Sequence, residues 1–356
     1  MPRPHRLVIT LAAAAALVLP GASPALARDA RQAAVVALGD SAASGEGAGD
    51  YEPGTRGENG DWCHRSPHAY VNGTGLAPVA VNLACSGATA ADVAFGPGGH
   101  YTEASQAERL VGVAQRYRVT TVVLQVGAND DAGLNATGVT CIRAFLDPSV
   151  PPCRDTLGPL LPARMAATAT KVEGAVRDVR EAMHRAGYDP DVYVLVLASY
   201  AAPVTERSVP LPAAQGCPYS RADARWGRTV LFPAMAAAVA GVAARTGARF
   251  LDLDRATESY EACSHTPYTQ EWQRRITVDP EALVYGGLDA VGFHLAQESF
   301  HPNAAAHAEM GRCLGDLVRS GATQAACVAG ADGHAHLGTD SPAPAAAQAV
   351  AWDLVR

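Results

Sequence analysis

Short, uninterrupted runs of apolar residues recur along the chain and constrain its fold more than any other feature. Five are evident, at residues 33–38, 79–84, 120–126, 192–197 and 248–253. Several of them run straight through without the apolar and polar alternation of a half-exposed strand. They therefore predict strands that are buried on both faces of a sheet.

Alanine-rich stretches with helical character lie between and after these runs, at residues 103–117, 161–186, 222–246 and 304–320. Strands that alternate with helices need crossover connections, so the pattern predicts one α/β domain with a parallel sheet. We place this domain at residues 28–328. The segment 329–356 is rich in Ala, Gly, Pro and Ser, which is typical of a flexible C-terminal tail.

The first 27 residues have the pattern of a secretory signal peptide. Arg3 and Arg6 precede an apolar run at residues 7–19, and the small-residue motif Ala25-Leu26-Ala27 follows. The apolar run is too short to span a bilayer, and we expect no later segment to reach the roughly 20 apolar residues required. The sequence thus predicts a secreted, extracellular protein without a stable membrane anchor.

Cysteine usage agrees with export. The eight cysteines form an even set without a Cys-x-x-Cys pair, which favours disulfides over zinc or redox chemistry. We expect sequential pairing, because each pair then closes a local loop: Cys63 with Cys85, Cys141 with Cys153, Cys217 with Cys263, and Cys313 with Cys327.

The charge balance argues against a nucleic-acid partner. The chain has 28 Lys and Arg against 35 Asp and Glu, a net charge of −7, and no basic stripe. Binding to phosphates requires clustered basic residues. We therefore expect no nucleic acid among its partners.

Ligands of an open parallel sheet bind at the carboxyl ends of its strands, so the residues after each run are the candidate site. Ser41 follows the first run in Gly39-Asp40-Ser41. A serine on a tight turn from strand to helix suits a nucleophile. A helix N-cap explains the same turn equally well, and the Gly-x-Ser-x-Gly elbow of α/β-hydrolases is absent from the chain.

Two later strand ends carry groups that could donate hydrogen bonds to a substrate. Gly87 lets a backbone N–H approach a ligand closely, although a strand-ending turn explains it as well. The side-chain amide of Asn129 could stabilise an oxygen that develops negative charge. Turn propensity alone also accounts for Asn-Asp at this place.

His301, just before the last helical stretch, is the candidate general base for Ser41. Glu298, three residues earlier, could curl back and orient the imidazole, and Asp252 is a remoter candidate. Of the four histidines at positions 265, 294, 301 and 307, His301 alone has an acid three residues before it and a proline after it. We expect His294 to be structural or to line the cleft, and His307 to be a surface residue.

The order of these pieces resembles the four sequence blocks of the SGNH (GDSL-type) hydrolases. The blocks are Gly39-Asp40-Ser41, Gly87, Gly127-Ala128-Asn129-Asp130 and His301. Cys63-His64-Arg65-Ser66 and Glu298-Ser299-Phe300-His301-Pro302-Asn303 also look like the secreted actinobacterial esterases and lipases of that family. The resemblance covers roughly residues 34–316.

The resemblance implies a flavodoxin-like three-layer sandwich with a parallel sheet of about five strands. It also implies Ser41 as nucleophile, His301 as base, and an oxyanion hole made of the Ser41 and Gly87 N–H groups and the Asn129 side chain. No metal or organic cofactor is implied. The family has Asp-x-x-His where this chain has Glu298, and in some secreted relatives a backbone carbonyl orients the histidine, so both alternatives stay open.

The predicted function is that of a secreted, monomeric esterase or lipase that acts on small-molecule or lipid esters through an acyl-enzyme. Two alternatives remain at this point. One is a polysaccharide O-deacetylase, and the other is a secreted binding protein that keeps the fold without turnover.

Overall fold

The structure is a computed structural model that describes residues 30–97 and 99–338. The predicted signal peptide and residues 339–356 of the predicted tail lie outside the described residues.

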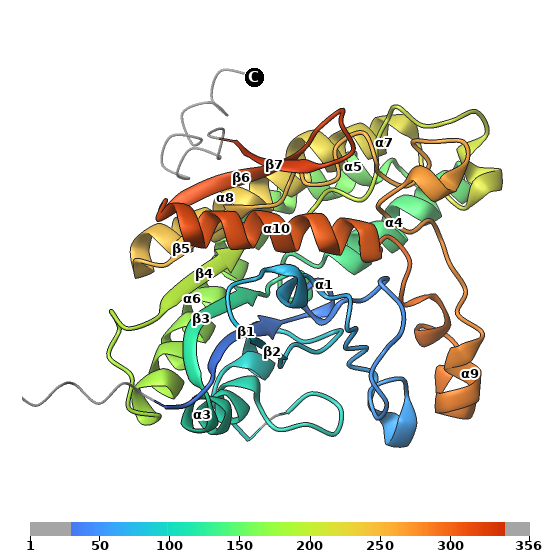
Figure 1. Ribbon diagram of the computed structural model, residues 1–356. Helices are drawn as coiled ribbons and strands as arrows, with labels where there is room; N and C mark the ends of the chain where they lie inside the picture. The colour runs from blue at the N-terminus through green and yellow to red at the C-terminus, as the bar shows by residue number, and fades with distance from the viewer. Residues whose placement is uncertain (1–29, 98, 339–356) are drawn as a thin grey trace, which may run out of the picture. The chain divides into compact units, whose positions relative to one another are not determined.

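A single mostly parallel sheet forms the centre of the domain, with the strand order β2-β1-β3-β4-β5-β6-β7 (Figure 1). Its strands are β1 (Ala33–Gly39), β2 (Val79–Asn82), β3 (Arg118–Gln125), β4 (Val194–Ala198), β5 (Arg249–Asp252), β6 (Gln324–Ala329) and β7 (Ala335–Gly338). The five expected runs are β1 to β5. The sheet has seven strands instead of about five, because β6 adds in parallel to β5 and β7 pairs antiparallel with β6.

Helices cover both faces of this sheet. They are α1 (Ser41–Ser44), α2 (Ala90–Val93), α3 (Gln106–Arg116), α4 (Leu134–Leu146), α5 (Cys153–Leu157), α6 (Leu161–Arg185), α7 (Arg221–Trp226), α8 (Phe232–Thr246), α9 (Glu281–Gly286) and α10 (Ala304–Ser320). Alternate residues of β1 enter different cores: Val36 and Leu38 pack with α3, α6 and α8, whereas Val35 and Ala37 pack with α10. This alternation produces the expected three-layer sandwich.

Two expectations about the later chain need correction. Residues 335–338, which we assigned to a flexible tail, form β7, because their backbone groups pair with β6 from Ala326 to Ala329. The segment Arg221–Thr246 is helical throughout and is long and apolar enough to span a membrane, contrary to our expectation. More than half of its apolar stretch is buried, and its α8 part packs against α6 and β5, so it serves as a core helix.

The described chain brings the carboxyl ends of β1, β2 and β3 together at one edge of the sheet. The four disulfides follow the sequential pairing: Cys63–Cys85, Cys141–Cys153, Cys217–Cys263 and Cys313–Cys327. The first of them joins the loop after α1 to the end of β2, directly beside the candidate site.

Candidate active site

Ser41 is the first residue of α1, immediately after β1, on a turn that requires glycine. Gly39 has φ +142°, and a Cβ at this position would lie 1.9 Å from the carbonyl oxygen of Gln125. Asp40 then acts as the N-cap of α1, because its carboxylate accepts a hydrogen bond of 3.2 Å from the Ala42 N–H. The turn thereby holds Ser41 at the carboxyl edge of the sheet.

His301 reaches Ser41 from the far end of the chain. Its Nε2 lies 2.8 Å from the Ser41 Oγ, and its Nδ1 lies 3.2 Å from the Ser299 carbonyl oxygen. A carbonyl can only accept, so Nδ1 carries the proton and Nε2 presents its lone pair to the serine hydroxyl. This tautomer is the one that a general base toward Ser41 needs.

Glu298 does not contact His301. Its carboxylate accepts a hydrogen bond of 2.6 Å from the Tyr51 hydroxyl and lies 3.9 Å from Arg274. Phe300, between the two residues, has φ +59°, so the segment does not follow the helical turn that would bring position 298 over position 301. Of the two alternatives, the geometry fits the backbone carbonyl as the group that orients His301.

Ser41, Gly87, Asn129 and His301 all line one cavity of about 360 Å³. Gly87 has φ +84°, in the left-handed region that favours glycine. One N–H of the Asn129 amide donates to the Ala88 carbonyl oxygen at 3.0 Å, which leaves its second N–H for another acceptor. The three expected oxyanion donors therefore share a cavity with the serine.

His100 supports one of these donors from behind. Its Nε2 lies 2.9 Å from the carbonyl oxygen of Ser86, and its Nδ1 lies 3.7 Å from Asp92. The Ser86 carbonyl and the Gly87 N–H are the two ends of one peptide unit. A hydrogen bond to the carbonyl therefore holds this peptide in place and polarises the Gly87 N–H.

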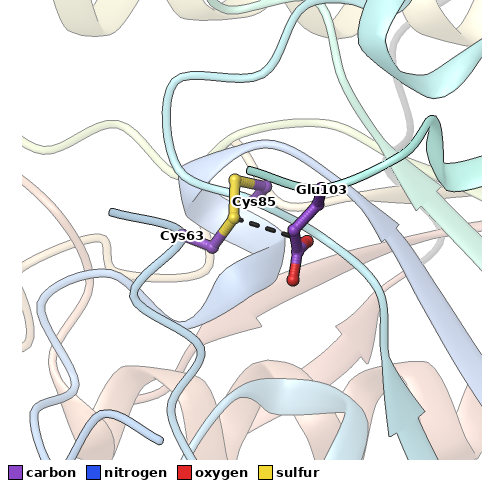
Figure 2. A group of neighbouring side chains, drawn as sticks. All are labelled: Cys63, Cys85 and Glu103. Atoms are coloured by element: carbon purple, nitrogen blue, oxygen red, sulfur yellow. Dashed lines mark hydrogen bonds between the residues drawn. A yellow bond between two sulfur atoms is a disulfide. The ribbon is translucent and has the colours of Figure 1, made fainter. Parts of the chain in front are cut away.

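The Cys63–Cys85 disulfide anchors the same loop from the other side. Figure 2 shows both sulfurs beside Glu103, with the Cys63 sulfur 3.5 Å from its carboxylate. These residue types could form a metal site, but both sulfurs are joined in the disulfide and are not thiolate ligands. The Glu103 carboxylate instead binds the guanidinium groups of Arg65 and Arg109.

A buried polar network lies behind His301. Glu46 is fully buried, and its carboxylate lies 3.0 Å from His64 Nδ1 and accepts 2.8 Å from the Gln297 side chain. Burial opposes ionisation of Glu46, but the charge and hydrogen bond of His64 outweigh it and hold the pKa of Glu46 at about 2. Burial likewise disfavours the imidazolium form of His64, but Glu46 raises its pKa above the usual value.

The candidate base and the residue before the serine also have shifted pKa values. Burial lowers the pKa of His301, and the Glu46 carboxylate offsets part of this effect. The imidazole is thus neutral at pH 7 and able to accept a proton. Burial raises the pKa of Asp40 to about 7, although the Tyr200 hydroxyl donates to it at 2.5 Å.

Most of the remaining cavity lining is apolar. The helix α4 contributes Val139 and Ile142, and the long helical segment opposite contributes Trp226, Leu231 and Phe232. Apolar side chains of this kind hold a hydrocarbon chain and exclude water. The cavity therefore offers a polar end at Ser41 and an apolar end between these helices.

The family model of the GDSL-like lipase/acylhydrolase family matches residues 37–309, which include all of the site residues above. The chain belongs to this family. It is accordingly a hydrolase that acts on ester bonds. Among curated proteins, none matches the sequence of this chain.

Two solved structures share the fold of this GDSL-like hydrolase. The extracellular lipase from Streptomyces rimosus is 22% identical, with a TM-score of 0.52, over 82% of this chain and 100% of that one. Phospholipase A1 from Streptomyces albidoflavus NA297 is 21% identical, with the same TM-score, over 82% and 100% of the two chains.

Three other predicted positions lie away from the serine of this hydrolase. His307 is fully buried and not a surface residue: its Nδ1 accepts from the Tyr70 N–H, and burial lowers its pKa to about 3. His294 stacks on Trp62 at 4.2 Å between ring centroids. Asp252 accepts a hydrogen bond from Ser199.

Sequence reasoning missed the residues behind the histidine and the oxyanion donors. Glu46, His64 and His100 were not singled out, because their contacts join loops that are distant in sequence. A signal was present for two of them: Glu46 lies between two glycines just after Ser41, and His64 belongs to a block shared with secreted relatives.

Proposed function

We propose that the chain is a secreted serine esterase or lipase in which Ser41 and His301 form a catalytic dyad. The observation that carries this proposal is the pair of contacts of His301, 2.8 Å to the Ser41 Oγ and 3.2 Å to the Ser299 carbonyl. The carbonyl takes the orienting role that an acidic side chain has in a triad. Glu298 is then a member of the polar network and not of the catalytic set.

The reaction follows from these contacts. His301 Nε2 takes the hydroxyl proton as the Ser41 Oγ attacks the ester carbonyl carbon. The N–H groups of Ser41 and Gly87 and the Asn129 amide stabilise the oxyanion. The imidazolium then returns its proton to the departing alcohol, and a water activated by His301 releases the acid from the acyl-enzyme. The ionised Glu46 favours the transient imidazolium.

The apolar end of the cavity supports an acyl chain longer than acetyl as the preferred substrate portion. An acetyl group would leave Ile142, Leu231 and Trp226 without an apolar partner. The polysaccharide O-deacetylase alternative is therefore disfavoured. Secretion is supported by the four disulfides, by the leader pattern at residues 1–27, and by the similarity to the extracellular Streptomyces rimosus lipase.

The test compares the wild type with Ser41→Ala on p-nitrophenyl esters from acetate to laurate. We expect kcat of the variant to fall by about 10⁴- to 10⁶-fold. For the wild type, kcat/KM should rise with chain length until the cavity is filled, by up to about fourfold for each buried CH₂ at ~0.8 kcal/mol. Equal rates for both proteins would leave a binding protein, and a maximum at acetate would favour the deacetylase.

A further inference from the structure

A segment that contributes Ile276 and Phe293 to the cavity lining also exposes several large apolar side chains. They lie in and around α9 and the short 3-10 helix η7 (Gly287–Ala290). We call this set the apolar rim; its members are Ile276, Val278, Leu283, Val284, Leu288, Val291 and Phe293. Leu288 is 89% exposed and Val284 75%, which is unusual for such residues in a soluble domain.

The apolar rim is held outward by the packing on its inner side. Ala282 and Ala290 are buried against Trp62, whose indole N–H donates to Asp289 at 2.8 Å. The Asp279 N–H also donates to the Leu295 carbonyl at 2.8 Å. Because the small residues fill the inner side, the leucines and valines of the segment face solvent.

Apolar surface continues from the apolar rim into the cavity. Ile276 and Phe293 belong to the apolar rim and also line the cavity that contains Ser41. On the opposite side, Val139 of α4 lines the cavity and is 61% exposed, and Leu146 follows on the same helix. A hydrocarbon chain could thus pass from outside to the serine without leaving apolar contact.

The charge of the segment limits what could cover it. Residues 276–293 contain Asp279, Glu281 and Asp289 but no lysine or arginine. Attraction to an anionic bilayer depends on basic residues near the surface. A layer of zwitterionic lipid, which presents apolar depth without net charge, fits this composition.

We propose that the apolar rim docks on a zwitterionic phospholipid surface and delivers lipid esters from that surface to Ser41. Insertion of the leucine and valine side chains removes apolar area from water, which is the driving force of interfacial binding. The orientation places the cavity mouth against the lipid, so an acyl chain enters without crossing water. This inference rests on the proposed function for its delivery step, although docking itself needs no catalysis.

Vesicle sedimentation with the full chain tests the docking. The probe is phosphatidylcholine vesicles, with a second set that contains phosphatidylglycerol, and the variants are Ser41→Ala, the double variant Val284→Ser/Leu288→Ser, and Val192→Ser. Val192 is 57% exposed and lies just before the amino-terminal end of β4, whereas the candidate site lies at the carboxyl ends of the strands. It is therefore the matched control. Thermal melting confirms that the variants fold.

We expect the wild type, Ser41→Ala and Val192→Ser to sediment with phosphatidylcholine, and the double variant to bind at least about tenfold more weakly. Phosphatidylglycerol should not strengthen binding. The proposal is overturned if the wild type stays in solution, if the double variant binds like the wild type, or if binding requires the anionic lipid. It is also overturned if sedimentation velocity shows a dimer that the double variant dissociates, because a second copy then covers the apolar rim.

Soluble p-nitrophenyl butyrate separates this proposal from the proposed function. The double variant should hydrolyse it like the wild type while losing activity on phosphatidylcholine vesicles. Undiminished hydrolysis by Ser41→Ala would remove the proposed catalytic role and leave vesicle binding standing. If the wild type hydrolyses butyrate but does not bind vesicles, the docking proposal falls and the proposed catalytic role stands.

Discussion

The two sides of the cavity differ in polarity. Behind His301, the polar network of Glu46, Tyr51, His64, Gln297 and Glu298 pairs its buried groups through hydrogen bonds. Opposite, the apolar wall of Val139, Ile142, Trp226, Leu231 and Phe232 offers only hydrocarbon and aromatic surface.

This difference assigns a separate task to each side. In the proposed mechanism, charge develops at the serine, the oxyanion and the imidazole, where fixed dipoles and one buried carboxylate can act on it. The acyl chain carries no charge and gains only from removal of apolar area from water. Substitutions in the polar network should therefore change turnover, and substitutions in the apolar wall should change chain-length preference.

Among the substitutions around the cavity, removal of the buried Glu46 charge should change turnover most. Glu46→Gln keeps the shape of the side chain but removes the carboxylate that raises the pKa of His301. The pKa of His301 then falls, so the ascending limb of kcat/KM should move to lower pH. The plateau of kcat should fall about tenfold, which corresponds to roughly one pKa unit of lost imidazolium stabilisation. A limb at the wild-type pH would show that Glu46 does not act on His301.

The stability of the protein reports the same charge independently. The pKa of Glu46 is depressed from 4.5 to about 2 in the folded state, so its contribution is present above pH 4.5 and is lost as the pH falls toward 2. The free energy of unfolding of the wild type, measured with urea, should fall between pH 4.5 and 2. The same free energy should depend less on pH in Glu46→Gln.

A leucine in the apolar wall should alter chain-length preference. Gly138 of α4 lines the cavity, and a Cβ there meets nothing within 4 Å. Gly138→Leu should lower kcat/KM for laurate about tenfold, the equivalent of two CH₂ groups at ~0.8 kcal/mol each, and leave acetate unchanged. It should also stabilise the protein by about 0.5 to 1 kcal/mol, because glycine disfavours a helix interior.

The matched control for that experiment is Gly112→Leu. Gly112 lies on α3, where a Cβ also meets nothing within 4 Å, and it is not part of the cavity. The control should gain stability without any change across the ester series. A parallel shift in both variants would mean that helix stability, and not cavity volume, sets the preference.

His100 should have a smaller effect on turnover. His100→Phe removes the hydrogen bond to the Ser86 carbonyl, whose peptide carries the Gly87 N–H. Loss of one such bond should reduce kcat about two- to tenfold with little change in KM. His100→Gln can still donate and should recover part of the rate. Equal rates in both variants would exclude a positioning role.

Glu298→Gln should have the smallest effect. The amide oxygen can still accept from Tyr51, and His301 remains bound to the Ser299 carbonyl. We expect kcat to stay within about threefold of the wild type, since only one hydrogen bond is weakened. A loss of several orders of magnitude would identify the Glu298 carboxylate as the orienting group.

Much of the fold and the pairing of Ser41 with His301 could be predicted from the sequence. The five apolar runs coincide with β1 to β5, and strand ends of a parallel sheet meet at one edge, so Ser41, Gly87 and Asn129 could be expected together. The added strand β7 could not be expected, because its composition resembles a tail and only pairing with β6 orders it.

Local spacing was a poor guide to Glu298 and His307. The interval of three residues suggested that Glu298 would reach His301, but the left-handed conformation of Phe300 changes the path of the backbone. The position of His307 in the helical stretch suggested a surface residue, but its ring accepts a hydrogen bond from the Tyr70 N–H of a distant segment. In both cases a contact between remote residues decides the role.

The sequence by itself determined the layers of the sandwich and the order of the strand-end residues. Both follow from the apolar runs and their order along the chain, which do not depend on contacts between distant segments. The tertiary structure alone decided that the Ser299 carbonyl and not Glu298 contacts His301, that Glu46 and His64 are buried, and that the leucines and valines of 276–293 are exposed. Burial, charge and exposure depend on which distant segments meet, and no local pattern in this chain encodes that meeting.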